Sequence, residues 1–187
     1  ERLASLLGPG IFDFPKDEQT LLRFIEMATG HCKDEAIILD FFAGSGTTAH
    51  SVMQLNAEDG GKRRYLLVQL PEVCDEKSAA YKSGYMTISE IAKERIRRAS
   101  NKIKQDNAGK PNIKSLDTGF RVFKVDTSNM ADVYYAPDAL DMANLDLFVE
   151  NIKPDRTPED LLFQVMLDWG VDLALPIAKE VVQGKEV

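Results

Sequence analysis

The sequence predicts a doubly wound α/β fold with a mainly parallel sheet, followed by a helical C-terminal extension. Helical and strand-like patterns alternate along residues 17–125. Two short apolar runs, at 36–39 and 65–70, lack the regular polar alternation of a sheet with one solvated face. Strands that alternate with helices pair in parallel through right-handed crossovers. This order therefore favours strands that are buried between two layers of helices.

Local signals place the individual elements. The spacing of apolar residues predicts an amphipathic helix from Asp17 to near Gly30. A second helix follows the glycine-bearing stretch 40–46 and ends at the turn Asp59-Gly60-Gly61. A third opens at the capping box that Thr87 begins. The remaining expected elements are a third strand at 120–125 and helices at 140–152 and from Pro158 onward.

The chain is expected to form two parts, 1–125 and 126–187. The change of character after the third strand, in the loop around residues 126–137, sets this boundary. In the second part, the helix that begins at Pro158 carries an apolar stripe that ends at Trp169, and we expect this tryptophan in a core. The stripe must be buried against its own chain or in a partner, so the extension is also a candidate subunit interface.

Composition narrows the class of protein. The net charge of −7 argues against a chain that clamps nucleic acid along its whole surface. Lys and Arg concentrate between Lys93 and Lys104, which predicts a solvated helix face and leaves a local basic surface open. Cys32 and Cys74 lack metal-ligand spacing, so we expect reduced thiols and no metal. Without an apolar run that could span a membrane or a signal-peptide pattern, a cytoplasmic protein is expected.

The stretch 40–48, Asp-Phe-Phe-Ala-Gly-Ser-Gly-Thr-Thr, carries the strongest functional signal. It joins a buried strand to a helix, and glycines there let the backbone approach a ligand whose anionic group meets the helix N-terminus. A P-loop is disfavoured because no lysine follows Gly46. A dinucleotide fingerprint is disfavoured because Ala49 is a marginal substitute for its third glycine. S-adenosylmethionine, whose anion is a carboxylate, is the remaining class of ligand.

This stretch closely resembles the D-x-F-x-G-S-G-T-T signature of DNA adenine-N-6 and cytosine-N-4 methyltransferases. Residues 12–16, Phe-Asp-Phe-Pro-Lys, look like the motif that those enzymes place before it when the catalytic segment comes first. Further stretches resemble the modification subunit of type III restriction-modification systems: residues 65–72, 119–124 and 151–162. The resemblance covers nearly the whole chain and implies a sheet of the S-adenosylmethionine-dependent methyltransferase type.

The resemblance also implies a set of cofactor-binding residues. Asp40 helps to position the methionyl amino group, and Phe42 forms the pocket wall with the Gly44 and Gly46 backbone. The hydroxyls of the loop could bind the carboxylate or could simply cap the helix. Gln69 stands where an acid usually binds the ribose, with Glu72 in reserve. The full set is Phe14, Pro15, Lys16, Asp40, Phe42, Ala43, Gly44, Ser45, Gly46, Thr47, Thr48 and Gln69.

Lys16 has the charge to pair with the cofactor carboxylate, although a surface lysine at a helix start is an equal alternative. Family members hold a flipped base with a D/N/S-P-P-Y/F motif, and no two of the 8 prolines here are adjacent. Together with a first residue, Glu1, that is not methionine, this predicts a piece of a longer chain whose catalytic motif lies upstream.

The parent is therefore expected to methylate double-stranded DNA, with adenine N-6 as the favoured target. Its expected protein partners are a restriction subunit and a second modification subunit. The fragment alone should be inactive. Two alternatives stay open: an amino-methyltransferase of RNA or protein, and a protein-interaction module of the modification subunit.

Overall fold

The computed structural model describes residues 2–131 and 151–186. The chain forms two compact units, Glu1–Gly119 and Phe120–Val187, and their boundary precedes the expected one at 125/126 by six residues. The first unit contains the helices α1 (Arg2–Leu7), α2 (Glu18–Thr29), α3 (Thr47–Asp59), α4 (Ala79–Lys82) and α5 (Ile88–Asp106), the strands β1 (Ile37–Asp40) and β2 (Arg64–Leu67), and the 3-10 helix η1 (Pro111–Ser115). The second contains α6 (Pro158–Asp168), β3 (Val181–Val182) and β4 (Lys185–Glu186).

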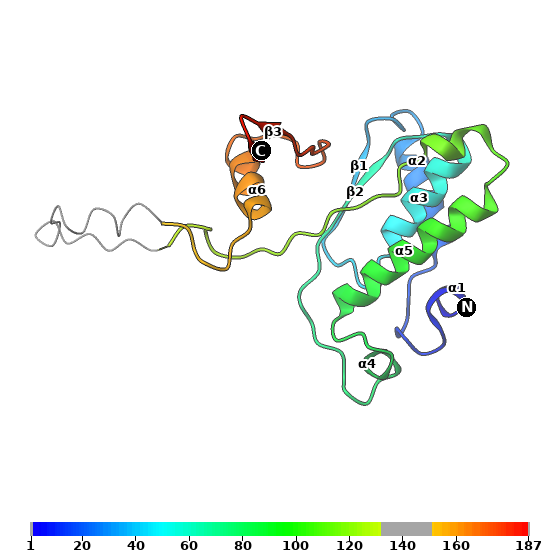
Figure 1. The fold of residues 1–187 in the computed structure, drawn as a ribbon. Helices are drawn as coiled ribbons and strands as arrows, with labels where there is room; N and C mark the ends of the chain where they lie inside the picture. The colour runs from blue at the N-terminus through cyan, green and yellow to red at the C-terminus, as the bar shows by residue number, and fades with distance from the viewer. Residues whose placement is uncertain (1, 132–150, 187) are drawn as a thin grey trace, which may run out of the picture. The chain divides into compact units, whose positions relative to one another are not determined.

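The strands β1 and β2 pair in parallel, from Ile37 opposite Arg64 to Asp40 opposite Leu67. This confirms the parallel pairing expected for the first two apolar runs. Helix α3, which connects them, contacts both α2 and α5 and lies between these two helices (Figure 1). Nearly every residue of α3 is buried, because α2, α5 and the sheet surround it.

One face of the two-stranded sheet is packed against helices. Ile38 of β1 and Tyr65 of β2 lie against a buried cluster from α2 and α3 that consists of Leu22, Ile25, Val52 and Leu55. Their burial removes apolar surface from water, at about 25 cal/mol per Å². This cluster fixes β1 and the N-terminus of α3 relative to one another.

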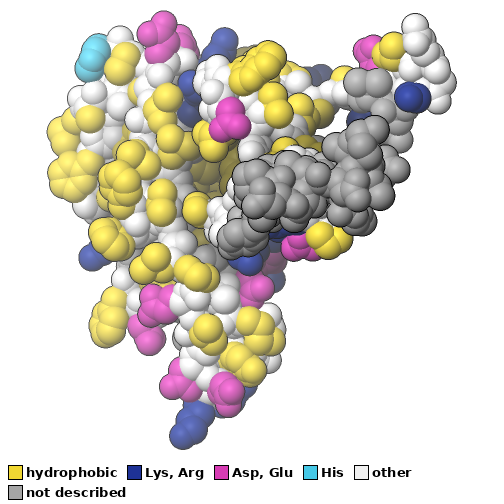
Figure 2. Space-filling model, turned by 90° about the vertical axis from the view of Figure 1, so that its left-hand side faces the viewer, with side chains coloured by type: hydrophobic (Ala, Val, Ile, Leu, Met, Phe, Trp, Pro, Cys, Tyr) yellow, Lys and Arg dark blue, Asp and Glu magenta, His cyan; other side chains and the backbone are white. Residues whose placement is uncertain are grey.

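The other face of the sheet is open in the described part of the chain. Ile37 and Leu39 of β1, Leu66 of β2 and Val68 just beyond it are each about half exposed. Figure 2 shows apolar side chains gathered over one face of the molecule. A doubly wound sheet carries helices on both faces, whereas helices pack against one face of this sheet among the described residues.

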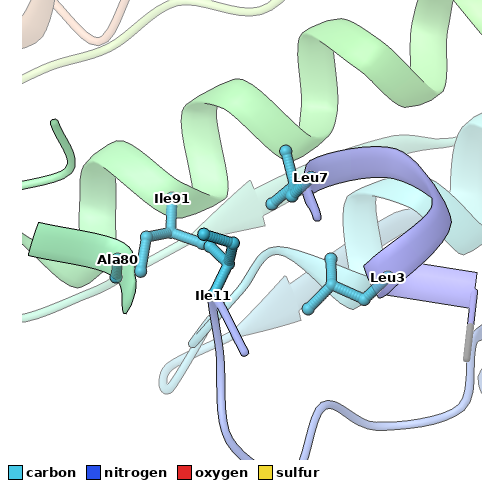
Figure 3. Packing of buried hydrophobic residues seen from close by; sticks show 5 residues of the cluster. All are labelled: Leu3, Leu7, Ile11, Ala80 and Ile91. Atoms are coloured by element: carbon cyan, nitrogen blue, oxygen red, sulfur yellow. The ribbon is translucent and has the colours of Figure 1, made fainter. Parts of the chain in front are cut away.

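A second core joins the beginning of the chain to α5. Leu3 and Leu7 of α1 pack with Ile11, with Ala80 of α4 and with Ile91 of α5 (Figure 3). The capping box predicted at the start of α5 is present, because Thr87 accepts a hydrogen bond from Glu90 N and the Glu90 side chain accepts one from Thr87 N. This core holds residues 8–15 beside α5.

In the second unit, the prediction of a strand at 120–125 is wrong. No strand forms there among the described residues. Instead, Arg121 donates hydrogen bonds to the carbonyls of Leu173 and Leu175, and the Phe123 ring packs edge-on against Phe163 of α6, with 4.9 Å between centroids. A strand is held by its ladder partners, and these residues are taken up by α6 and the chain that follows it.

Helix α6 begins at Pro158 as predicted, behind a capping box between Thr157 and Asp160. Trp169 is 80% exposed, so the expectation that it lies in a core is wrong for the described residues, where Met166 is the buried member of the stripe. The helix expected at 140–152 falls largely outside the described residues.

Candidate functional site

The site is built where β1 ends and α3 begins. Asp40 is the last residue of β1, and Thr47 is the first of α3. Between them, Gly44 and Gly46 have φ values of 52° and 76°, a left-handed conformation that side chains with a Cβ rarely adopt. The two glycines therefore allow the short connection from strand to helix that the sequence pattern predicts.

The loop is fastened to the end of β2 by three hydrogen bonds. Val68 N donates to the Asp40 carbonyl (2.8 Å), and Ala43 N donates to the Val68 carbonyl (3.1 Å). Gly44 N donates to Oε1 of Gln69 (2.8 Å). Because this oxygen accepts from the loop, the NH2 group of Gln69 is left for a ligand. Asp40 and Gln69, far apart in the sequence, thus border the same loop.

The carboxylate of Asp40 organises both sides of the loop. Its Oδ1 accepts from Phe42 N (3.0 Å), and its Oδ2 accepts from the hydroxyl of Thr48 (2.5 Å). These bonds fix the side chain at the carboxyl end of β1, and each oxygen keeps lone pairs for a further donor. Phe42 itself is exposed, as is the neighbouring Phe41.

The hydroxyls of Ser45 and Thr47 are used inside the protein. Both residues are buried, and Nη1 of Arg95 from α5 donates to Oγ of Ser45 (2.8 Å) and to Oγ1 of Thr47 (2.6 Å). A carboxylate bound at this helix start would therefore meet the loop backbone before it met these hydroxyls. The sequence also allowed these hydroxyls to cap the helix. They do not, because the N-cap of α3 is Gly46, and no side chain caps this helix.

Arg95 belongs to the basic stretch from Lys93 to Lys104 that was expected to form a solvated helix face, and for this buried residue the expectation is wrong. A sequence signal for its burial was nevertheless present. Arg95 lies on the apolar stripe of α5, next to Ile96 and one turn after Ile91, and a charge on such a stripe predicts a buried ion. Its carboxylate partner is Glu18, with Nη2 and Oε2 3.7 Å apart. Burial lowers the pKa of Arg95 to about 10, while the charge of Glu18 acts in the opposite direction.

The segment before α2 approaches the same loop. A Cβ placed on Gly44 would lie 3.4 Å from the ring of Phe12, so this phenylalanine, also absent from the expected set, packs on the loop. Phe14 is 95% exposed and has a φ of 52°, which is uncommon for a bulky residue and is often found at ligand sites. Pro15 is half-buried, and Lys16 and Glu72 are exposed.

Other kinds of site find no support in the described residues. Within 2–131 and 151–186, no group of three or more His, Cys, Asp or Glu side chains is placed to hold a metal ion. Among the same residues, none of the helices is long and apolar enough to cross a membrane. Cys32 and Cys74 are free thiols.

Comparison with known proteins bears directly on this site. A DNA methylase family model matches residues 3–109, which include the loop, Gln69 and Arg95. The Mod subunit of the type III restriction-modification enzyme StyLTI from Salmonella typhimurium is 41% identical over 127 residues, 68% of this chain and 18% of that protein. The EcoP15I Mod subunit from Escherichia coli is 44% identical over 94 residues, 50% of this chain and 13% of that protein.

A type II methyltransferase, M.KpnI from Klebsiella pneumoniae, is 38% identical over 99 residues, 53% of this chain and 23% of that protein. The chain thus spans less than a quarter of the length of these relatives. The resemblance to type III modification subunits is confirmed. Because the family model covers more than half of its length, the chain belongs to the DNA methylase family.

Proposed function

We propose that this chain is the S-adenosylmethionine-binding part of a DNA methyltransferase of the type III restriction-modification class. The observation that carries the proposal is the left-handed glycine loop between β1 and α3, bordered by Asp40 and by Gln69. In an open α/β sheet, ligands bind beyond the carboxyl ends of the strands, where this loop lies. The similarity to the StyLTI and EcoP15I Mod subunits supports the same conclusion.

The residues present fit this cofactor. Asp40 would accept hydrogen bonds from the methionyl amino group, and the NH2 group of Gln69 would donate to the ribose. The exposed ring of Phe42 offers an apolar surface for the adenine, and Lys16 offers a positive charge for the carboxylate. Ala43, Gly44, Ser45, Gly46, Thr47 and Thr48 would contribute their backbone. When bound, S-adenosylmethionine supplies the methyl group for transfer.

The open face of the sheet supports a larger, doubly wound fold in the parent. Side chains of β1 and β2 leave apolar surface in water on that face, although the opposite face is packed by α2 and α3. Further strands and a second helix layer, supplied by the parent protein, would bury Ile37, Leu39 and Leu66.

In the parent we propose methyl transfer to a flipped base of double-stranded DNA, with adenine N-6 as the target. A restriction subunit and a second modification subunit are the proposed protein partners, and the cytoplasm is the proposed location. The exposed stripe on α6, with Leu162, Val165 and Trp169, supports a role for residues 126–187 in subunit contacts. Truncation of the parent after Val125 should then change its oligomeric state in light scattering.

Two measurements test the proposal. Calorimetry should detect weak binding of S-adenosylmethionine or S-adenosylhomocysteine to the chain, and binding of NAD or ATP instead would refute the assignment of the loop. In a tritiated-methyl assay on mixed-sequence duplex DNA, the full-length parent should be active and the chain alone should not. Activity of the chain alone would show that the catalytic segment lies within it.

A further inference from the structure

Arg95 is a deeply buried charged residue, with 1% of its surface exposed. It lies on the face of α5 that presses on the glycine loop. One turn earlier on the same face, Ala92 occupies the space beside Gly46, where an added Cβ would lie 3.4 Å from both the Cβ and the carbonyl oxygen of Ala92. Helix α5 therefore supports the loop with two residues, a small one and a charged one.

The hydrogen bonds of Arg95 bridge the two residues that flank a glycine of the loop. Ser45 and Thr47 flank Gly46, the left-handed residue at the N-cap of α3, and a single guanidinium nitrogen donates to both of their hydroxyls. A guanidinium only donates, so both oxygens are fixed as acceptors. Because glycine has the widest choice of backbone conformations, this bridge selects one of them.

A second arm of Arg95 reaches the first turn of α2. Glu18, its ion-pair partner, is buried in the first turn of α2, and the Glu18 carbonyl accepts a hydrogen bond from the Ser51 hydroxyl (2.9 Å). Glu18 follows Lys16 by two residues. Arg95 thus connects the glycine loop to the start of α2, which closely follows the candidate cofactor-binding residues 14–16.

Stability alone is a poor explanation for this arrangement. Among the described residues, nothing accepts a hydrogen bond from Nε of Arg95, and the 3.7 Å ion pair is long. Removing a guanidinium from water is unfavourable unless its donors are paired well, and apolar side chains of similar volume often stabilise a core at least as much. The contacts that are short all go to the loop.

We propose that Arg95 is a positioning residue for the cofactor: it holds the glycine loop against the start of α2 in the geometry that binds S-adenosylmethionine. The proposal rests on the proposed function of the loop. Arg95 acts through the backbone of residues 44–47, and it needs no contact with the cofactor. Misplacing a binding loop by about 1 Å reduces affinity or rate by about tenfold to a hundredfold.

The test uses the full-length protein that contains this chain. Calorimetry with S-adenosylhomocysteine reports stoichiometry and Kd separately, so unfolded molecules lower the stoichiometry and leave the Kd of the folded ones unchanged. Arg95→Met should raise the Kd about tenfold or more, and Arg95→Lys should recover part of the loss. Steady-state methylation should show the same rise in KM for S-adenosylmethionine, with kcat changed less.

Two further variants keep the test decisive if Arg95→Met folds poorly. The double variant Ser45→Ala/Thr47→Val removes both acceptors and keeps the Arg95–Glu18 pair, and it should also raise the Kd. Arg63→Met removes an equally buried arginine at the far end of α3 and should lower the melting temperature without changing the Kd. If the wild type binds normally and the Kd is unchanged in both Arg95→Met and Ser45→Ala/Thr47→Val, the proposed role of Arg95 is overturned. Failure of the wild type to bind would overturn the proposed function instead.

Discussion

Each end of α3 is held by a buried arginine, and the two arginines are satisfied to different degrees. At the C-terminal end, Nη1 and Nη2 of Arg63 donate to the two carboxylate oxygens of Asp59 (3.1 and 2.9 Å), and Nε donates to the hydroxyl of Thr29 (2.6 Å). At the N-terminal end, Arg95 has two hydroxyl acceptors, one long ion pair and an Nε for which the described part of the chain offers no acceptor. The Arg63 network is typical of an interaction that stabilises the fold, whereas the Arg95 network supports a loop.

The two ends of α3 are therefore expected to contribute differently to stability and to ligand binding. A bidentate arginine–carboxylate pair with further hydrogen bonds repays the burial of its charge. The Arg63 carbonyl and Nη1 also bind Asn56, which closes the turn between α3 and β2. At the N-terminal end of α3, by contrast, the polar side chains bond to the loop backbone and to one another, next to two left-handed glycines. We expect variants at the first end to change unfolding and variants at the second to change ligand binding.

The largest effect on stability is expected for Arg63→Met. Removal of the guanidinium leaves the partly buried Asp59 carboxylate without its partner and should lower the free energy of unfolding by about 3 kcal/mol. Urea unfolding monitored by circular dichroism measures this loss. Lys62→Met, at the exposed neighbouring residue, is the control and should change stability little. Equal stability of the two variants would contradict the structural role of Arg63.

A smaller decrease in the free energy of unfolding is expected for Gly61→Ala, which acts on the same network without changing a charge. A Cβ at this position would lie 2.5 Å from Nη1 of Arg63 and 2.9 Å from Oδ1 of Asp59, so one of them must move. Overpacking of this kind costs about 2 kcal/mol. Nothing lies within 4 Å of a Cβ on Gly109, and Gly109→Ala should be nearly neutral in the same measurement. Additive effects of Gly61→Ala and Arg63→Met would show that the clash lies elsewhere.

The pH dependence of stability should reveal the Asp59 end of the network. Burial on its own raises the pKa of Asp59, but the hydrogen bonds from Arg63 and from Gly61 N outweigh it and hold the pKa below its usual value. A lowered pKa in the folded state contributes stability above the ordinary pKa of 3.8, and this is lost as pH falls through the folded value. Asp59→Asn should flatten this part of the acid unfolding curve, and an unchanged curve would contradict the network.

The smallest effect is expected at Tyr65, on the packed face of the sheet. Its buried hydroxyl has no hydrogen-bond partner among the described residues, and burial, followed by the charge of Asp117, raises its pKa to about 12. The stability linked to a raised pKa is present below pH 10 and is lost as pH rises toward 12. Tyr65→Phe should be neutral or stabilise by up to about 1 kcal/mol and should weaken the alkaline loss. A clear destabilisation at pH 7 would reveal a partner for the hydroxyl.

The sequence predicts the local structure at the loop end of α3 better than its distant contacts. The strand, loop and helix from Ile37 to Asp59 follow from apolar periodicity and glycine positions, and these are local signals. That Asp40 and Gln69 border the same loop follows from parallel pairing, which the alternating order predicts. The Arg95 bridge joins residues about fifty positions apart, and local patterns give only the hint of a charge on an apolar stripe.

Tertiary context also explains the main error. Residues 120–125 have the β-branched and aromatic composition of a strand, but strand propensity needs a neighbouring strand to become structure. Within the described residues, Arg121 and Phe123 instead contact α6 and the carbonyls that follow it. The exposure of Trp169 was missed for a similar reason. An apolar stripe predicts burial but does not specify the surface that covers it.

Hydrogen exchange on the full-length protein, with and without saturating S-adenosylhomocysteine, tests the cofactor assignment most directly. Peptides that cover residues 40–48 and Gln69 should exchange more slowly when the ligand is present, because it orders the loop at the N-terminal end of α3. Peptides that cover residues 59–64, at the Arg63 end, should be unaffected. Equal protection at both ends of α3, or unchanged exchange at the loop with the ligand bound, would contradict a cofactor site at the glycine loop.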